Sequence, residues 1–382
     1  MKTIQSILFA AIVLAVSGVY ISCTKDNASS TSEPSIQYIR ITKPESSDSL
    51  LVGAYQSNLI AIVGNNLQDA KEIWFNDQKA TLTPTYITNT TILVSVPSKI
   101  PIDITNKLKI VFSNGKILEH DFKVEISEPL VSSMDCEYVL TGNVATIRGD
   151  YFYEPLTVTF QGGVTGEVVS VEDKIIKVTV PESAEPGPIT VKTNFGETKS
   201  DFWFKDNRNI FISSDPWSGW WGSSFVVTDP APNDPPAING NYIRVQKAIG
   251  GWNWMEVAGG PPSAMGDISK NIPDEAILKP ELYNLKFEVN TLKPYNNNMI
   301  KLNAGLSSDF NNNQYLWSPP YDTKGEWQTV VIPFDEMAAS YGGTLSVSAN
   351  GYYSRILFHG GGDLDCDMCF DNFRIVPKVL KK

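Results

Sequence analysis

An internal repeat places the strongest limit on how this chain can fold. Short runs that alternate apolar and polar residues, bounded by Gly, Asn and Pro, occur twice in the same order, as expected for half-buried antiparallel strands. The first copy has runs at 59–67, 72–77, 92–97 and 108–115, and the second at 144–152, 156–162, 176–181 and 189–196. Gly64 and Gly149 lie 85 positions apart, as do Phe75 and Phe160. Each copy therefore predicts one small β-sandwich.

The region after the repeats predicts a third β-domain. Tyr283, Leu285, Phe287 and Val289 alternate with polar residues and would share one strand face. More strand-like runs follow, no helical periodicity is longer than about ten residues, and one short helix is predicted near Asp335. With 382 residues the chain is too long for one core. We therefore expect an all-β protein with two small sandwiches and a third β-sandwich over residues 207–382.

Tryptophan is concentrated in this third region. Seven of the nine Trp residues fall in the region from Trp217 to Trp327. Three of them, Trp217, Trp220 and Trp221, lie within five consecutive positions in a Pro/Ser/Gly-rich segment that is predicted to be a loop. Large aromatic side chains on a loop expose flat apolar faces, which costs free energy unless a partner covers them. A sugar ring is a flat apolar partner that also carries hydroxyl groups. The loop therefore predicts a carbohydrate-binding surface.

Other aromatic residues divide into candidates for binding and for packing. Trp252 and Trp254 are predicted to share a strand face with Glu256, and an unpaired carboxylate would be costly in a core. Tyr315 and Trp317 also share a face, for which both binding and packing stay open. Trp74, Trp203 and Trp327 are predicted to pack. The candidate glycan-binding residues are Trp217, Trp220, Trp221, Trp252, Trp254, Glu256, Tyr315 and Trp317.

Charge and metal-ligand patterns limit the other functions. A net charge of −11 argues against nucleic acid as a partner. Cys366 and Cys369 would point to opposite faces of a strand, so neither a disulfide nor a metal site is predicted there, and no catalytic residue or cofactor is expected. The alternating carboxylates of Asp363, Asp365 and Asp367 could hold a structural calcium ion, although the closing Glu of an EF-hand is missing.

The N-terminus predicts export and attachment to a membrane. Lys2 precedes an apolar run from Ile7 to Ile21, which is typical of a signal peptide over residues 1–22. The following Ser22–Cys23 pair resembles a bacterial lipoprotein cleavage site, which implies a lipid on Cys23. Residues 23–35 would then form a polar tether.

The repeats and the C-terminal motifs together resemble a known family. The Gly-Asn or Gly-Asp turn and the later Val-x-Val-Pro of each copy resemble IPT/TIG immunoglobulin-like domains, here 36–126 and 127–206. The strands at 325–333 and 371–377 resemble those of jelly-roll carbohydrate-binding modules. With the lipoprotein signal and the Trp-rich region, the chain resembles the surface glycan-binding protein B family, whose C-terminal domain is of the xyloglucan-binding type.

The resemblance implies a non-catalytic, lipid-anchored polysaccharide binder on the bacterial outer membrane, beside a TonB-dependent transporter. A flat Trp surface favours an extended β-linked chain such as xyloglucan or mixed-linkage glucan, with residues 207–382 binding and the repeats acting as a spacer. A secreted jelly-roll glycoside hydrolase is one alternative, but the close-spaced carboxylate signature of jelly-roll glucanases is absent. An adhesin for a host protein is another.

Overall fold

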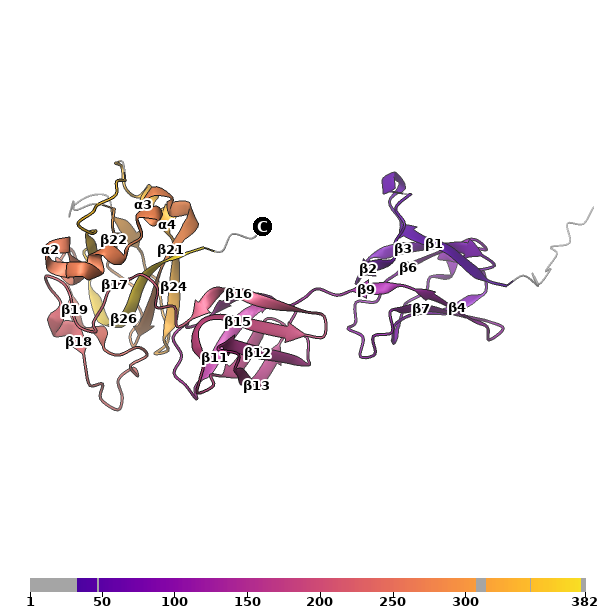
Figure 1. Cartoon of the computed structure of the whole chain (residues 1–382), viewed down its shortest axis with the longest axis horizontal. Helices are drawn as coiled ribbons and strands as arrows, with labels where there is room; N and C mark the ends of the chain where they lie inside the picture. The colour runs from indigo at the N-terminus through magenta and orange to yellow at the C-terminus, as the bar shows by residue number, and fades with distance from the viewer. Residues whose placement is uncertain (1–32, 47, 307–313, 344, 379–382) are drawn as a thin grey trace, which may run out of the picture. The chain divides into compact units, whose positions relative to one another are not determined.

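The computed structural model describes residues 33–46, 48–306, 314–343 and 345–378, and it confirms an all-β protein (Figure 1). Contacts divide the chain into two compact units, Met1–Ile126 and Ser127–Lys382. The helices are short: α2 (Pro262–Met265), α3 (Asp274–Leu278) and α4 (Phe334–Ala339), together with 3₁₀ turns at Pro44–Ser46, Pro84–Tyr86, Ser223–Phe225, Gly266–Asn271 and Pro280–Leu282. No helix among the described residues has the length and hydrophobicity needed to cross a membrane.

The first unit is a β-sandwich around a single apolar core. Its strands are β1 (Ser35–Ile41), β2 (Gly53–Tyr55), β3 (Leu59–Asn65), β4 (Ala70–Phe75), β5 (Gln78–Lys79), β6 (Thr91–Ser95), β7 (Lys107–Phe112), β8 (Ile117–Asp121) and β9 (Lys123–Glu125). One sheet has the order β1-β3-β6 and the facing sheet β5-β4-β7-β8, while β2 pairs with β9. Inward residues such as Ile62, Ile73 and Ile110 are fully buried between the sheets. Trp74 lies on the outer face of β4 between the ammonium groups of Lys79 and Lys109.

The second repeat, at the start of the second unit, folds in the same way. Its strands are β10 (Leu130–Met134), β11 (Val144–Asp150), β12 (Leu156–Gln161), β13 (Thr165–Glu172), β14 (Ile175–Thr179), β15 (Glu185–Thr193) and β16 (Gly196–Phe204), in the order β10-β11-β14-β13-β12-β15-β16. Its core gathers the inward residues of β11, β12, β14 and β15. β13 pairs with both β14 and β12, and so joins the two halves of the sandwich.

The repeated glycine has the same steric role in both copies. A Cβ on Gly64 would lie 1.9 Å from the carbonyl oxygen of Ser35, and a Cβ on Gly149 would lie 1.8 Å from that of Leu130. In each copy the first strand passes this glycine and then shifts register by a bulge. Only glycine allows the backbones to approach so closely.

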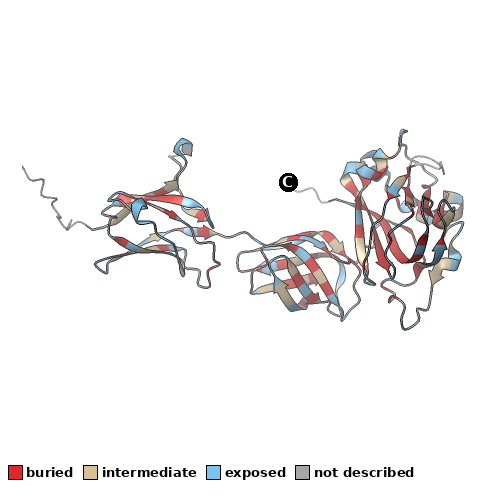
Figure 2. Cartoon of the chain, turned by 180° about the vertical axis from the view of Figure 1, so that it is seen from behind, coloured by how far each residue is buried: buried red, intermediate tan, exposed pale blue. Residues whose placement is uncertain are grey.

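The C-terminal domain is a two-layer β-sandwich. Its strands are β17 (Ile210–Ile212), β18 (Val226–Val227), β19 (Tyr242–Ile249), β20 (Met255–Gly260), β21 (Tyr283–Thr291), β22 (Ile300–Ala304), β23 (Tyr315–Trp317), β24 (Gln328–Pro333), β25 (Ser354–Phe358) and β26 (Leu364–Pro377). One sheet has the order β18-β19-β26-β21-β24 with β17 also on β26, and the other β20-β25-β22-β23. Tyr283, Leu285, Phe287 and Val289 belong to the core between them, as their alternation predicts. Figure 2 shows the buried residues of this domain in red along its strands.

The outer face of β21 and β26 is buried as well, because the second repeat packs against it. Glu137, from the segment between β10 and β11, accepts hydrogen bonds from Lys286 (2.5 Å) and Arg374 (2.7 Å). Arg374 also donates to both carboxylate oxygens of Glu288 (2.8 and 2.9 Å), and all four side chains are buried. We call these four residues the junction ion cluster.

Apolar and backbone contacts surround the junction ion cluster. Trp327 and Tyr242 from the C-terminal domain pack with Cys136 and Tyr138 of the second repeat. The Tyr138 hydroxyl donates to the carbonyl oxygen of Asp206. Since charged, apolar and backbone contacts all cross this boundary, the second repeat and the C-terminal domain form one packed unit.

Candidate functional site

The candidate site follows strand β20, which lies at the edge of the four-stranded sheet and pairs only with β25 within it. The segment 217–222 lies along the other side of β20. Gly219 bridges Gly259, and the backbone N–H of Trp220 donates to the carbonyl oxygen of Gly259 at 3.0 Å. A Cβ on Gly222 would lie 1.8 Å from the carbonyl oxygen of Val257, so this glycine lets the loop lie flat on the strand.

Two of the three tryptophans on this segment face solvent. Trp220 is 49% exposed and Trp221 63% exposed. Trp217 differs, because its partly buried indole packs against the main core of the domain. The structure therefore brings Trp220 and Trp221 together as an exposed pair and gives Trp217 a supporting position.

A second exposed pair, Trp252 and Trp254, precedes β20. They are 67% and 46% exposed. The sequence predicted that they share a strand face with Glu256, and this is wrong, because β20 begins only at Met255 and both residues lie in the turn before it. Trp252 has a φ of 62°, and its backbone N–H donates to the carbonyl oxygen of Gly360 at 2.6 Å.

The imidazole of His359 holds the second pair together. Its ring centroid lies 5.5 Å from that of Trp252 and 5.1 Å from that of Trp254, in tilted and edge-on geometries that aromatic pairs favour. His359 directly follows β25, which pairs with β20 so that Phe358 is opposite Met255. Sequence analysis missed His359 because only this strand pairing brings it near the two indoles.

Glu256 and Arg355 form the polar side of the site. Arg355 is buried, and one of its nitrogens lies 3.7 Å from a Glu256 carboxylate oxygen. The guanidinium carbon of Arg355 also lies 5.0 Å from the centre of the Trp254 ring, within cation–π range. The Glu256 carboxylate, which was predicted to be unpaired in a core, is therefore paired with Arg355.

Comparison with known proteins shows which families the chain resembles. The family model for the surface glycan-binding protein B xyloglucan binding domain matches residues 204–377. The crystal structure of the surface glycan-binding protein PbSGBP-B from Prevotella bryantii aligns with a TM-score of 0.67 at 25% identity, covering 91% of this chain and 99% of that one. Residues 204–377 thus match the surface glycan-binding protein B xyloglucan binding domain, and the chain as a whole is similar to a surface glycan-binding protein B.

A curated relative with IPT/TIG domains is also similar to part of this chain. An IPT/TIG domain-containing protein from Bacteroides ovatus is 26% identical over 140 residues, which is 35% of this chain and 28% of that protein. The match therefore spans little more than a quarter of the relative's length.

Two of the predicted binding residues belong to the core side of the four-stranded sheet. Trp317 is only 8% exposed and packs edge-on against Phe287 and Tyr321. Tyr315, two residues earlier on β23, is partly buried against the same core, and burial raises the pKa of its hydroxyl. Both are corrected to packing residues, because alternation along β23 turns them inward and leaves Leu316 exposed.

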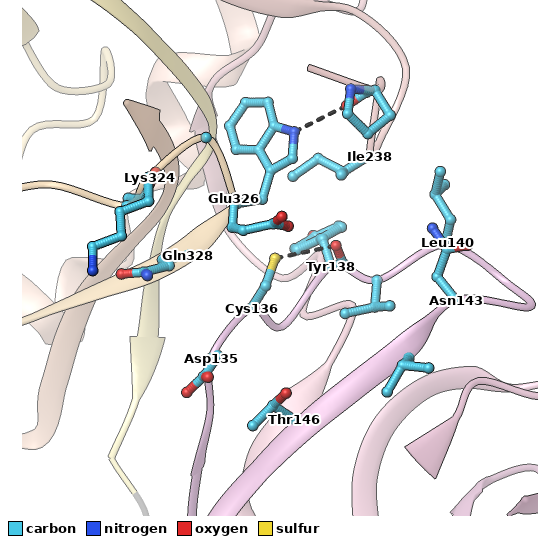
Figure 3. A pocket seen from close by; sticks show the side chains of 16 residues that line it. Asp135, Cys136, Tyr138, Leu140, Asn143, Thr146, Ile238, Lys324, Glu326 and Gln328 are labelled. Atoms are coloured by element: carbon cyan, nitrogen blue, oxygen red, sulfur yellow. Dashed lines mark hydrogen bonds between the residues drawn. The ribbon is translucent and has the colours of Figure 1, made fainter. Parts of the chain in front are cut away.

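A cavity of about 580 Å³ lies beside Trp327 at the junction with the second repeat (Figure 3). The Trp327 indole is buried there, and its N–H donates to the carbonyl oxygen of Pro236 at 2.9 Å. Tyr138, which also lines the cavity, is buried too. Neither ring presents a free face, so the cavity lacks the exposed aromatic surface found along β20.

The acidic residues 363–367, predicted as a calcium site, are each bound to a different protein group. Asp363 accepts a hydrogen bond from the backbone N–H of Gly251. Asp365 pairs with Lys293, and Asp367 with Arg244. Among the described residues, no three Asp, Glu, His or Cys residues are placed to bind one metal ion. The calcium prediction at these positions is therefore corrected, because the three carboxylates bind Gly251, Lys293 and Arg244 instead.

Proposed function

We propose that this protein captures a polysaccharide on the exposed indoles of Trp220, Trp221, Trp252 and Trp254. The observation that carries the proposal is the position of four large, half-exposed aromatic side chains along one edge strand. Such faces are costly in water and favourable against a flat ligand. Along β20, the distance from Trp254 to the contact of Trp220 with Gly259 is on the order of 17 Å. The surface therefore suits several successive sugar rings.

The expected affinity follows from ring stacking. Stacking on an aromatic side chain contributes about 1–3 kcal/mol per ring, taking base stacking as the reference. Two or three stacked sugars then give dissociation constants between about 1 μM and 1 mM. Glu256, whose side chain keeps 14% of its surface exposed, can accept a hydrogen bond from a sugar hydroxyl and so help to orient the chain. This affinity suits a protein that must release its ligand to a transporter.

The ligand class follows from the shape of the surface and from the family. Exposed indoles spread along one edge strand suit an extended β-linked chain better than a helical one. The matching family model is described as a xyloglucan binding domain. We infer that the ligand is a β-glucan, with xyloglucan and mixed-linkage glucan as the first candidates.

We infer that binding occurs without catalysis. Glycosidases need two carboxyl groups about 5–9 Å apart, one on either side of the scissile bond. The carboxylates nearest the exposed indoles already hold protein groups: Glu256 pairs with Arg355, and Asp363 accepts the N–H of Gly251. The resemblance to binding proteins supports the same conclusion.

The protein is further proposed to be a lipoprotein of the outer membrane, exposed at the surface and associated with a TonB-dependent transporter. The Ser22–Cys23 signal supports this proposal, and Cys23 lies outside the described residues. Replacing Cys23 by Ala should release the protein from the membrane fraction and leave soluble glycan binding unchanged. Membrane attachment that persists in this variant would contradict the anchor.

The central experiment is isothermal titration calorimetry of the soluble chain with xyloglucan, mixed-linkage glucan and starch, combined with analysis of the sugar products. We expect binding to a β-glucan and no shortened products. Release of oligosaccharides would favour the hydrolase alternative. Failure to bind any polysaccharide, including those on a glycan array, would favour the host-protein adhesin.

A further inference from the structure

Strand β26 leaves a gap in the six-stranded sheet. Along one edge it pairs with β19 as far as Phe370, and then with β17 from Phe373. Asp371 and Asn372 fall between these two partners, and Asn372 has a φ of 52°. A cavity of about 480 Å³ opens at the gap and is lined by Ile210, Ile212, Ser213, Asp215, Asn239, Gly240, Ile268, Asn271, Asp371 and Asn372.

Asp371 is the unusual residue in this lining. It is only 6% exposed, and its Oδ1 accepts the backbone N–H of Asn372 at 2.8 Å. Its Oδ2 is buried and has no hydrogen-bond partner among the described residues. Buried carboxylates are normally paired or bound to a metal, since an uncompensated buried charge is strongly unfavourable.

The neighbouring charges do not compensate Asp371. Asp215 adds a second carboxylate to the same lining, and its Oδ1 accepts the N–H of Asn241 at 2.8 Å. Arg374 directs both terminal nitrogens to Glu288, Glu137 and the backbone of Asn372. Neither Asp215 nor Asp371 forms an ion pair with a described residue. Burial, together with the nearby Glu288 and Asp215 carboxylates, raises the pKa of Asp371, and the Arg374 guanidinium offsets this only in part.

We propose that Asp371 and Asp215 bind a divalent cation, with calcium as the best fit, in the gap between β17 and β19. Calcium takes six to eight oxygen ligands, including carboxylates, amide carbonyls and waters. The polar groups of this lining come from Asp, Asn and Ser side chains, with no thiol or imidazole. The cation would balance the Asp371 carboxylate and fill the gap.

The position of Asp215 links the cation to the binding surface. Asp215 lies two residues before Trp217, at the start of the segment that carries Trp220 and Trp221. A cation held by Asp215 and Asp371 would tie this segment to the central strand β26. The proposed cation site does not depend on the identity of the glycan.

Thermal melting of the purified chain tests the proposal. After treatment with EDTA and dialysis, saturating CaCl₂ should raise the Tm of the wild type by on the order of 5 °C. Asp371→Asn should lose this shift, and in EDTA it should melt above the wild type because it buries no charge. Asp365→Asn, on an exposed carboxylate paired with Lys293, is the matched control and should keep the shift.

Direct calcium titration by calorimetry separates binding from general stabilisation. One calcium per chain is expected for the wild type, with at least tenfold weaker binding in Asp215→Asn, which serves as a second variant if Asp371→Asn does not fold. A wild type that neither binds calcium nor gains stability would overturn the proposal. So would Asp371→Asn and Asp215→Asn proteins that bind calcium as tightly as the wild type.

Discussion

At the scale of single residues, the tryptophans are distinguished by what covers their faces. Trp254 has one face near the Arg355 guanidinium and leaves nearly half of its surface open, whereas aromatic side chains enclose Trp317. Both occur in similar local sequence, beside polar and aromatic residues. Their different surroundings predict different consequences of substitution.

Replacing Trp254 by Ala should weaken β-glucan binding by about 1–3 kcal/mol, because one stacking ring is lost. Its Tm should change little, since the indole is half exposed. Trp317→Ala should instead lower the free energy of unfolding by about 3–5 kcal/mol, because it empties a core site. Calorimetry and thermal melting of both variants would decide. If Trp254→Ala melts early and binds normally, the binding and packing roles are exchanged.

His359 should act as a positioning residue for the two indoles that it contacts. His359→Ala should weaken glycan binding because Trp252 and Trp254 lose their common support, while His359→Phe should retain binding because it keeps a planar ring. In a double-mutant cycle, His359→Ala and Trp254→Ala should be non-additive by about 0.5 kcal/mol or more. Additive effects would show that His359 does not position Trp254. If Trp254→Ala leaves glycan affinity unchanged, the result contradicts the proposed binding surface and does not test the role of His359.

At the scale of elements, the segment between β10 and β11 determines how the second repeat joins the C-terminal domain. It places the Glu137 carboxylate against Lys286 and Arg374. The backbone N–H of Glu137 also donates to the hydroxyl oxygen of Thr329 on β24 at 2.7 Å. Buried ion pairs contribute little net stability, but removing one partner leaves the others uncompensated. The junction ion cluster is therefore sensitive to single substitutions.

Glu137→Ala should lower the free energy of unfolding of the unit formed by residues 127–382 by about 3–5 kcal/mol. Asp135→Asn is the matched control, because Asp135 forms a partly exposed pair with Arg148 and should contribute at most about 1 kcal/mol. Urea unfolding of both variants would measure the difference. Equal, small losses would mean that the junction relaxes without Glu137.

Strand elements could be predicted from sequence far better than their tertiary contacts. The alternation of apolar and polar residues along β21 predicts which of its side chains point into the core, because a burial period of two residues is a local property of a strand. The outward residues Lys286 and Glu288 read as solvent-facing by the same rule, yet they are buried by the second repeat. His359 has the same limitation: it meets Trp252 and Trp254 because β25 pairs with β20, and no local pattern encodes that pairing.

At the scale of the whole molecule, the junction changes what counts as the binding unit. The sequence suggested that residues 207–382 would bind glycan alone, with both repeats as spacers. A cut after Asp206 removes Glu137 and Tyr138, and leaves Arg374 and Lys286 without one of their partners. It also exposes Trp327 and Tyr242, which pack with the second repeat. The smallest stable binding fragment should therefore begin near Ser127.

Three fragments test this prediction. Residues 127–382 should bind β-glucan as tightly as the mature chain, because they keep both the β20 edge and the junction. Residues 207–382 should melt at least several degrees lower or aggregate, because the fragment exposes an apolar patch and loses the Glu137 carboxylate. Residues 36–206 should not bind. Calorimetry and thermal melting of the three fragments provide the measurements. A 207–382 fragment that equals 127–382 in both melting temperature and affinity would show that the junction only joins two independent domains.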